Sequence, residues 1–283
     1  MGLIGKTVRW ALNAIPRTVL QRVASLAVPV VGVLYLGKGR QCTICNSKRR
    51  RFLPYGYGKV REDALCPSCL SLERHRLLWH YLMHNHSDRF AAQQTILHIA
   101  PEVCLMRQFR KIYTSNPKSY ITADLESPLA DMHFDVQQIP IEDNSVDIII
   151  CNHLLEHVES DHKALTEMYR IMRSGGLGIM LAPIDYSREV TYEDNTITDP
   201  KQRAELFGQY DHRRVYGLDY LNRLSAAGFE AEEIDYAATF TESERTLHSF
   251  GCDKLYSPPP PGKVTPWWVG RPGTAGCFLN VTG

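Results

Sequence analysis

The stretch Gln94-Thr-Ile-Leu-His-Ile-Ala-Pro-Glu102 decides how the chain folds. Residues 95–99 form an apolar run of strand length, and a small residue and a proline then stop the strand and turn the chain. A helical pattern follows over residues 103–113, and a second strand, 120–123, ends on Asp124. An acidic residue about 20 residues beyond a strand–turn–helix unit is typical of nucleoside-binding α/β folds, where it binds ribose hydroxyls. The stretch therefore predicts a nucleoside site.

Strands and helices continue to alternate along the chain after this stretch. Further strands are predicted at 132–136 (strand or turn), 147–151, 177–181 and 229–236, and further helices from Leu154 or Ser160 to Met172 and over 219–227, closed by Gly228. Strand 147–151 is apolar throughout, as expected for a central strand that is covered on both faces. The alternation predicts an α/β fold with a doubly wound, mostly parallel sheet of six or seven strands, and ligands at the carboxyl ends of the strands.

Charge is distributed unevenly along the chain. The chain has 283 residues and a net charge of +1, and this length is enough for one large domain plus a small one. Residues 1–61 contain twelve Lys or Arg and no Asp or Glu, so the remaining residues are strongly acidic in balance. We therefore expect the front of the chain to meet any anionic partner, such as a membrane surface, nucleic acid or a phosphorylated substrate.

The most apolar run of the chain lies at residues 23–36, within a basic segment that we delimit as 1–40. As a helix, this run would span about 21 Å, short of the roughly 30 Å hydrocarbon core of a bilayer. Pro29 and Gly32 weaken the helix, and the run lies too late for a signal peptide. Two interpretations fit: an anchor on a membrane surface, or an arm that packs on the catalytic domain. We expect a cytoplasmic protein, peripheral to the inner face of the membrane under the first interpretation.

Four of the eight cysteines form two Cys-x2-Cys pairs, Cys42/Cys45 and Cys66/Cys69, with 20 residues between them. Each pair places two thiolates on one side of a tight turn, and two such turns complete a tetrahedral zinc site. All four ligands come from the protein, so the zinc would be structural. With an amphipathic helical pattern after the second pair, the spacing predicts a small zinc ribbon plus helix over residues 41–86 in a reducing compartment.

Two later segments resemble the type 11 group of class I S-adenosylmethionine-dependent methyltransferases. Asp135-Val-Gln-Gln-Ile-Pro-Ile-Glu-Asp-Asn-Ser-Val-Asp147, followed by Ile-Ile-Ile-Cys-Asn-His-Leu-Leu-Glu-His157, is similar to the family's segment from an adenine-side acid into the fourth strand and its Leu-Glu-His ending. Met172-Arg-Ser-Gly-Gly-Leu177 resembles the Pro-Gly-Gly turn into the fifth strand, with serine replacing proline. The resemblance implies a Rossmann-like methyltransferase domain over 93–240. Beyond it we expect an irregular, Pro-rich tail, 241–283, with Cys277–Val281 as a poor candidate for the seventh strand.

The resemblance also implies S-adenosyl-L-methionine as cofactor and a set of residues that bind it. Asp124 would hold the ribose hydroxyls, Asp135 and Val136 would meet the adenine, and Asn152 would lie beside the sulfonium. The full predicted cofactor-binding set is His98, Ala100, Pro101, Glu102, Asp124, Leu125, Asp135, Val136 and Asn152. The loop after residue 99 departs from the family because it contains no glycine, although Ala100 still permits a close approach of the cofactor. The alternative for both aspartates is an ordinary turn residue.

A long polar segment, 183–217, follows the fifth predicted strand and has the length of a lid or substrate-binding loop. His212 is flanked by Asp211, and a histidine oriented by a carboxylate can deprotonate an acceptor hydroxyl. His153, at the end of the fourth strand, is the second catalytic candidate. The alternative for His212 is an anchor for the loop.

The favoured function is methyl transfer to an oxygen or nitrogen of a small-molecule, glycan or lipid-linked acceptor. One alternative is a zinc-ribbon RNA methyltransferase in which Arg49–Arg51 grip phosphates, although the chain lacks an Asn-Pro-Pro-Tyr-like motif for a base amine. Another is a nucleoside-binding or interaction module without catalytic activity. Retention of both aspartates favours the enzyme, and the loop without glycine favours the binding module.

Overall fold

The computed structural model of the chain describes residues 32–56, 60–251 and 255–257, which form two compact units. Among these residues the first unit comprises 32–76 with 242–250, and the second comprises 77–241 with 251 and 255–257. No helix in the described ranges is both long and apolar enough to cross a bilayer. The predicted arm, 1–40, lies outside these ranges up to residue 31, so the choice between anchor and packing arm stays a prediction.

The described part of the first unit includes two short antiparallel pairs of strands and helix α9. Strand β1 (Leu36–Gln41) pairs with β2 (Lys48–Arg49), and β3 (Leu53–Tyr55) pairs with β4 (Arg61–Leu65). Helix α9 (Glu242–His248) lies against β1, in a segment where we expected irregular chain. A Cys-x2-Cys turn follows β1, and the other follows β4, so the two strand pairs present the four cysteines.

Arg76 is the buried cation that ties this unit together. Its guanidinium donates to the carbonyl oxygens of Ala64 at 3.0 Å, Ser71 at 2.7 Å, His248 at 2.8 Å and Ser249 at 2.7 Å, and it lies over the Phe52 ring. A buried charge is stable only when it is fully hydrogen-bonded. The four carbonyls meet this requirement and thereby join the chain around the second cysteine pair to the segment after α9.

The second unit contains a five-stranded, wholly parallel sheet with the strand order β7-β6-β5-β8-β9. The strands are β5 (Ile96–Ile99), β6 (Tyr120–Asp124), β7 (Met132–His133), β8 (Val146–Asn152) and β9 (Met172–Leu181). Ile96 lies opposite Tyr120 on one side and Ile148 on the other, which brings the carboxyl ends of β5, β6 and β8 to one edge. The predicted doubly wound parallel sheet is confirmed.

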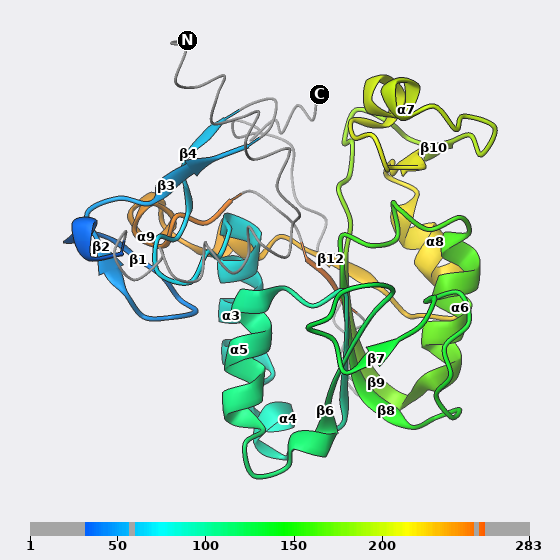
Figure 1. Cartoon of the computed structure of the whole chain (residues 1–283), viewed down its shortest axis with the longest axis horizontal. Coiled ribbons are helices and arrows are strands. Elements are labelled where there is room, and N and C mark those ends of the chain that lie inside the picture. Colours follow the sequence, from blue (N-terminus) through cyan, green and yellow to red (C-terminus); the bar gives the residue numbers. More distant parts are fainter. Residues whose placement is uncertain (1–31, 57–59, 252–254, 258–283) are drawn as a thin grey trace. The chain divides into compact units, whose positions relative to one another are not determined.

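Helices cover both faces of this sheet (Figure 1). Helices α4 (Ser87–Ala91) and α5 (Val103–Ile112) lie on one face, and α6 (Asp161–Ile171) and α8 (Tyr220–Ala226) lie on the other. Helix α3 (Glu73–Asn85) adds its Trp79 ring to the ring of Phe109 in α5, with centroids 5.3 Å apart. The Ser160 hydroxyl caps α6 by accepting from the Lys163 amide, as a serine before an amphipathic run predicts.

The long segment 183–217 is structured rather than an open loop. It contains helix α7 (Pro200–Phe207) and the antiparallel pair of β10 (Tyr192–Glu193) and β11 (Arg214–Val215). The Asp199 carboxylate caps α7 by accepting from the Gln202 amide, and Pro200 occupies the first helical turn, where its missing N–H costs nothing.

The placement of the predicted sixth strand is wrong in one respect. Strand β12 (Glu232–Ile234) does not join the five-stranded ladder but pairs antiparallel with β13 (Leu255–Ser257), which lies against β9. Three-residue strands are too short to show a period of two, which explains why sequence patterning overlooks β13. The weaker candidate for the seventh strand, Cys277–Val281, lies outside the described residues.

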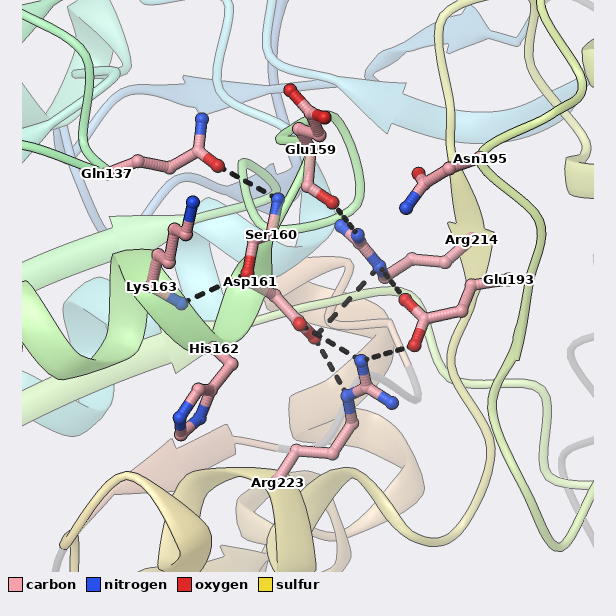
Figure 2. A pocket seen from close by; sticks show the side chains of 10 residues that line it. All are labelled: Gln137, Glu159, Ser160, Asp161, His162, Lys163, Glu193, Asn195, Arg214 and Arg223. Atoms are coloured by element: carbon pink, nitrogen blue, oxygen red, sulfur yellow. Dashed lines mark hydrogen bonds and ion pairs between the residues drawn. The ribbon is translucent and has the colours of Figure 1, made fainter.

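A buried ion network joins α6, α8 and the β10–β11 pair beside a cleft of about 320 Å³ (Figure 2). The Asp161 carboxylate accepts from Arg223 at 2.8 and 2.9 Å and from the Tyr216 hydroxyl at 3.0 Å. Arg214 and Arg223 both donate to Glu193 at 2.9 Å. Burial opposes ionisation of Asp161, but the Arg223 hydrogen bonds and the two arginine charges outweigh it and lower the pKa of Asp161.

We expect Asp161→Asn to lower the free energy of unfolding by about 3 kcal/mol, because Arg223 loses its two hydrogen bonds to the Asp161 carboxylate and Glu193 is left to balance the charges of both arginines. The folded-state pKa of Asp161 is depressed, so the wild-type advantage is present above the ordinary Asp pKa of about 3.9 and is lost as the pH falls through the folded-state value. Urea unfolding at several pH values measures both effects. Asp143→Asn is the matched control, since Asp143 pairs with Arg170 at the exposed surface and should change stability by less than about 1 kcal/mol. An equal loss of stability in the two variants would contradict the stabilising role of the Asp161 ion pairs.

Candidate functional site

At the carboxyl edge of the sheet, the chain leaves two strands through residues with left-handed backbone conformation. Ala100, just after β5, has φ of 49°, and His153, just after β8, has φ of 50°. Each donates its amide to the carbonyl at the end of a neighbouring strand: Ala100 to Ala123 at 2.8 Å and His153 to Leu181 at 2.7 Å. Residues other than glycine adopt this conformation at a cost of about 1–2 kcal/mol, and such strain concentrates at functional sites.

A chain of hydrogen bonds crosses three strands at this edge. His98 is fully buried, with Nδ1 2.9 Å from the Tyr120 hydroxyl and Nε2 3.0 Å from the Glu102 carboxylate. A carboxylate only accepts, so Nε2 carries the ring proton and Nδ1 accepts from Tyr120. Burial raises the pKa of Tyr120 and keeps that hydroxyl protonated. The Asn152 amide donates to the other Glu102 oxygen at 3.1 Å.

The residues present fit a polar ligand at this edge. Asn152 is buried, and its Oδ1 has no hydrogen-bond partner among the described residues. Leaving a buried carbonyl oxygen unpaired costs about 1–3 kcal/mol, unless a ligand donates to it. Glu102 lies beside it with a partly exposed carboxylate, so the edge offers an anion and a vacant acceptor to a cationic or hydrogen-bond-donating group.

The predicted cofactor residues separate into those that line the edge and those that lie behind it. Ala100, Pro101 and Glu102 form the half-buried turn after β5, and Leu125 is exposed after β6. His98 is fully buried behind this turn, where its two ring nitrogens contact Tyr120 and Glu102, and its role toward a cofactor stays a prediction.

The two predicted aspartates both hold turns through their side chains. Asp124 Oδ1 accepts from the amides of Glu126 and Ser127 at 2.9 and 2.8 Å, and Asp135 Oδ1 accepts from the Gln137 amide at 2.9 Å. Asp135 is exposed, while the neighbouring Val136 is buried. The described hydrogen bonds of Asp124 use only one carboxylate oxygen. Turn formation and ligand binding therefore remain compatible, and the cofactor roles of these residues stay predictions.

Three ionisable side chains gather beside His153. Glu156, His157 and His212 bring one ligand atom each to within 4.8 Å of one another, and the two imidazole rings meet edge-on with centroids 4.7 Å apart. Burial opposes ionisation of Glu156, but contact with His153 and the charges of His153 and His157 hold its pKa below the ordinary value. Burial lowers the pKa of His212 despite the attraction of Glu156 and keeps its imidazole neutral near pH 7.

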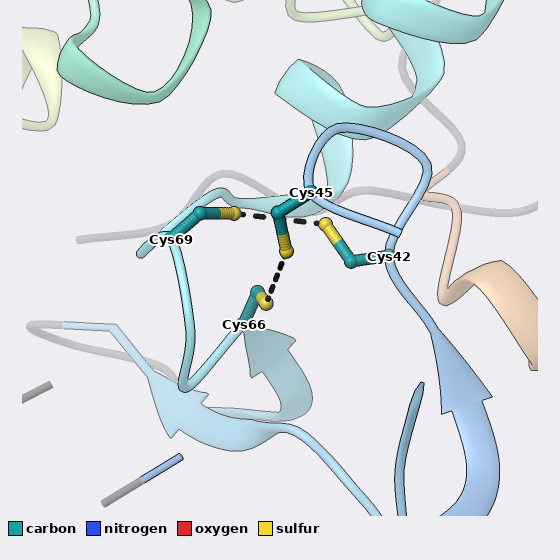
Figure 3. A group of neighbouring side chains, drawn as sticks. All are labelled: Cys42, Cys45, Cys66 and Cys69. Carbon is teal, nitrogen blue, oxygen red and sulfur yellow. Dashed lines mark hydrogen bonds between the residues drawn. The ribbon is translucent and has the colours of Figure 1, made fainter. Parts of the chain in front are cut away.

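The four cysteines of the first unit also gather as predicted (Figure 3). The Cys42 and Cys69 sulfurs lie 3.6 Å apart, and those of Cys45 and Cys66 lie 3.8 Å apart. Zinc–sulfur bonds of about 2.3 Å in a tetrahedron require sulfur separations of about 3.8 Å, which these two pairs match, and all four sulfurs lie within 4.8 Å of one another. Four thiolates at this distance repel one another strongly unless a cation lies between them.

Each cysteine turn repeats the same local design. The amide of its first cysteine donates to the carbonyl five residues on: Cys42 to Ser47 at 3.1 Å, and Cys66 to Ser71 at 2.9 Å. The serine hydroxyls then lie 3.1 and 3.2 Å from the sulfurs of Cys45 and Cys69. Hydroxyls at this distance can donate to thiolates and orient them for a metal. The Cys-x2-Cys-x-Ser repeat was visible in the sequence, but the serines were not singled out.

Sequence reasoning missed Tyr120 and Glu156. Tyr120 opens a strand and therefore resembles a packing residue, and only the register that places it opposite Ile96 brings its hydroxyl to His98. Glu156 belongs to the quoted Leu-Glu-His ending, but nothing in the sequence shows that it is 1% exposed with one oxygen unpaired. The available signal was the position of Glu156 between two histidines, His153 and His157.

We expect Ala100→Gly to raise the free energy of unfolding by up to about 1 kcal/mol. Glycine relieves the left-handed strain at φ 49°, and its larger unfolded-state entropy offsets part of that gain. Urea unfolding of the ligand-free protein measures the change. Ala130→Gly is the control: Ala130 has no positive φ, so the same substitution should lower stability. A loss of stability in both variants would contradict the backbone strain at Ala100.

Comparison with known proteins relates part of the second unit to a known family. Residues 87–180 match the family described as "Methyltransferase domain". A Mycolicibacterium smegmatis protein described as a probable S-adenosylmethionine-dependent methyltransferase is 25% identical over 101 residues, which cover 36% of this chain and 35% of that protein. The chain therefore matches about a third of the length of this curated relative.

Solved structures are similar to this chain at low sequence identity and with modest TM-scores. An S-adenosylmethionine-dependent methyltransferase from Mesorhizobium loti has a TM-score of 0.41 and 14% identity, with 58% of this chain and 90% of that chain covered. One from Archaeoglobus fulgidus has a TM-score of 0.38 and 12% identity, with 64% and 91% covered. The assignment rests on the strand order and the family match. Together these show that residues 87–180, within the second unit, resemble a class I S-adenosylmethionine-dependent methyltransferase domain.

Proposed function

We propose that the chain transfers a methyl group from S-adenosylmethionine to an oxygen or nitrogen of a small-molecule or glycan acceptor. The observation that carries the proposal is the buried Oδ1 of Asn152, which has no hydrogen-bond partner in the part of the chain that the structure describes and lies beside the Glu102 carboxylate, at the carboxyl end of β8. Ligands of open parallel sheets bind at this edge. The bound cofactor would supply a methyl group on a cationic sulfur, and the chain's own residues would hold the two substrates in line.

Different residues at the carboxyl edge of the sheet would bind different parts of the cofactor. Glu102, held by His98 and Asn152, offers a fixed negative charge to the cofactor's ammonium group. Ala100 lets the backbone of the turn approach closely, since its side chain is a single methyl group. Asp124 offers its second carboxylate oxygen to the ribose, and the Val136 amide offers a donor to the adenine ring.

The acceptor side of the proposal involves His153 and His212. His212 is neutral near pH 7, with Nδ1 3.1 Å from the Phe207 carbonyl, which fixes the proton on Nδ1 and leaves Nε2 as an acceptor. A neutral, oriented imidazole can take a proton from an acceptor as the methyl group arrives. His153 lies next to Asn152, and its ring is 3.5 Å from the Glu156 carboxylate.

Cofactor binding gives the direct test. We expect isothermal calorimetry to detect binding of S-adenosylhomocysteine to the wild type, and Glu102→Gln to weaken it about tenfold, the equivalent of about 1.4 kcal/mol. Glu142→Gln, on the exposed turn before β8, is the matched control and should bind like the wild type. Absence of binding at millimolar ligand would favour the non-catalytic module instead. If the ligand binds, a screen with radiolabelled methyl donor against small metabolites, glycans and RNA identifies the acceptor.

We also propose that the four cysteines bind a structural zinc ion. The sulfur separations of 3.6 and 3.8 Å, together with the serine hydroxyls beside two of the sulfurs, support this role. All four positions of the tetrahedron are filled by protein, so the ion would hold the ribbon together and take no part in methyl transfer.

Removal of one ligand should release this zinc. We expect elemental analysis to find one equivalent of zinc fewer in Cys66→Ser than in the wild type, and the thermal transition of the first unit to be lost or lowered. Cys104→Ser, which changes a buried cysteine of α5 in the second unit, should keep the wild-type zinc content. Equal zinc content in wild type and Cys66→Ser would overturn the site.

A further inference from the structure

We propose that Glu156, His157 and His212 form a second metal site that binds a divalent transition-metal ion such as Zn²⁺, Co²⁺ or Fe²⁺. Two imidazoles and a carboxylate are the donor set that such ions prefer over Mg²⁺ or Ca²⁺. The three side chains lie next to His153, at the carboxyl end of the central strand. They are separate from the four cysteines, which belong to the other unit.

The spacing of the three donors suits one ion. Their ligand atoms lie within 4.8 Å of one another in the ion-free structure. Metal bonds of about 2.0–2.2 Å hold neighbouring ligand atoms about 3–4 Å apart. The remaining gap is about 1 Å, and the two rings already meet edge-on with centroids 4.7 Å apart.

Each of the two histidines has an oxygen atom beside its Nδ1. Nδ1 of His157 lies 3.5 Å from the Asp211 carboxylate, and Nδ1 of His212 lies 3.1 Å from the Phe207 carbonyl oxygen. Metal-binding histidines usually donate one ring N–H to such an oxygen, which fixes the tautomer and directs the other nitrogen to the metal. In both rings Nδ1 faces the oxygen atom, which leaves Nε2 to bind the metal ion.

The third donor supplies the independent evidence that a ligand belongs here. Glu156 is 1% exposed, and its Oε2 has no hydrogen-bond partner among the described residues, while Oε1 lies 3.5 Å from His153. A buried carboxylate oxygen without a donor is costly, and such groups usually pair with a cation or coordinate a metal. An ion between Glu156 and the two rings would satisfy this oxygen.

The surrounding chain holds the three donors in place before any ion arrives. Arg214, which is almost fully buried, donates to the carbonyl oxygens of Leu155, Val158 and Glu159 and so fixes the turn that carries Glu156 and His157. The Arg213 amide donates to the Glu156 carbonyl at 2.8 Å, which brings the neighbouring His212 to the same turn. A preformed geometry of this kind lowers the cost of binding.

Three protein ligands leave at least one coordination position open, as in catalytic rather than structural metal sites. If the proposed function holds, an acceptor hydroxyl bound at this position would lose its proton to solvent more readily, because the ion stabilises the oxyanion. His212 would then hold the ion through Nε2 instead of acting as the base. Metal binding itself does not depend on that role.

Metal content of the full-length protein tests the site. We expect the wild type, loaded with Co²⁺ and desalted, to hold one equivalent more than His212→Ala and His157→Ala by elemental analysis. The extra equivalent should show cobalt d–d bands without the thiolate charge-transfer bands of a cysteine site. His162→Ala, which removes an exposed histidine from α6, is the matched control and should keep the wild-type content. Circular dichroism checks that each variant is folded.

The outcomes separate this inference from the proposed function. Equal cobalt content in wild type and folded His157→Ala or His212→Ala would overturn the second metal site. If His157→Ala does not fold, the folded His212→Ala alone decides. Calorimetry with S-adenosylhomocysteine on the same preparations tests the cofactor site: binding without the extra metal ion overturns only the metal site, and the extra metal ion without binding overturns only the cofactor site.

Discussion

The hydrogen-bond chain from Tyr120 through His98 and Glu102 to Asn152 is the constraint on which the carboxyl edge of the sheet depends. It connects β6, β5 and β8 through side chains, and His98, at its centre, is fully buried. A shift of one residue in the register of β5 would turn His98 to the other face of the sheet and leave its partners unpaired. The loss would cost about 1–3 kcal/mol for each buried polar group. The register of the sheet and the position of Glu102 are therefore set by the same interactions.

The turn that follows β8 depends on a buried cation, the guanidinium of Arg214. Arg214 donates to three carbonyl oxygens within residues 155–159 and also pairs with Glu193. Asp161, which begins α6, pairs in turn with Arg223 of α8. Charged groups inside a protein fix geometry because each one needs all its partners. The segment 183–217 thus stabilises the turn after β8 through Arg214. The same segment also carries His212.

Much of this architecture could be predicted from the sequence, and the reasons are local. Strands β5, β6 and β8 are apolar runs that end at turn residues, and the four cysteines have the spacing of a metal site. The rest depends on contacts between distant residues. Tyr120 reaches His98 only through the parallel register, and Glu156 meets His212 only because of backbone hydrogen bonding across 57 positions between Arg213 and Glu156. Strand β13 depends on pairing with β12, since three residues carry no recognisable period.

The absence of glycine from the turn after β5 acquires a physical meaning from the backbone. Ala100 adopts the left-handed conformation that glycine would adopt at no cost, and His153 does the same after the adjacent strand β8. At both positions the amide donates to the end of a neighbouring strand, so the two turns have one geometry in common. At Ala100 a methyl group is the smallest side chain that keeps this geometry without glycine's flexibility. At His153 the same backbone carries an imidazole to the edge, where its ring lies 3.5 Å from the Glu156 carboxylate. The lack of a glycine is thus compatible with a formed cofactor loop.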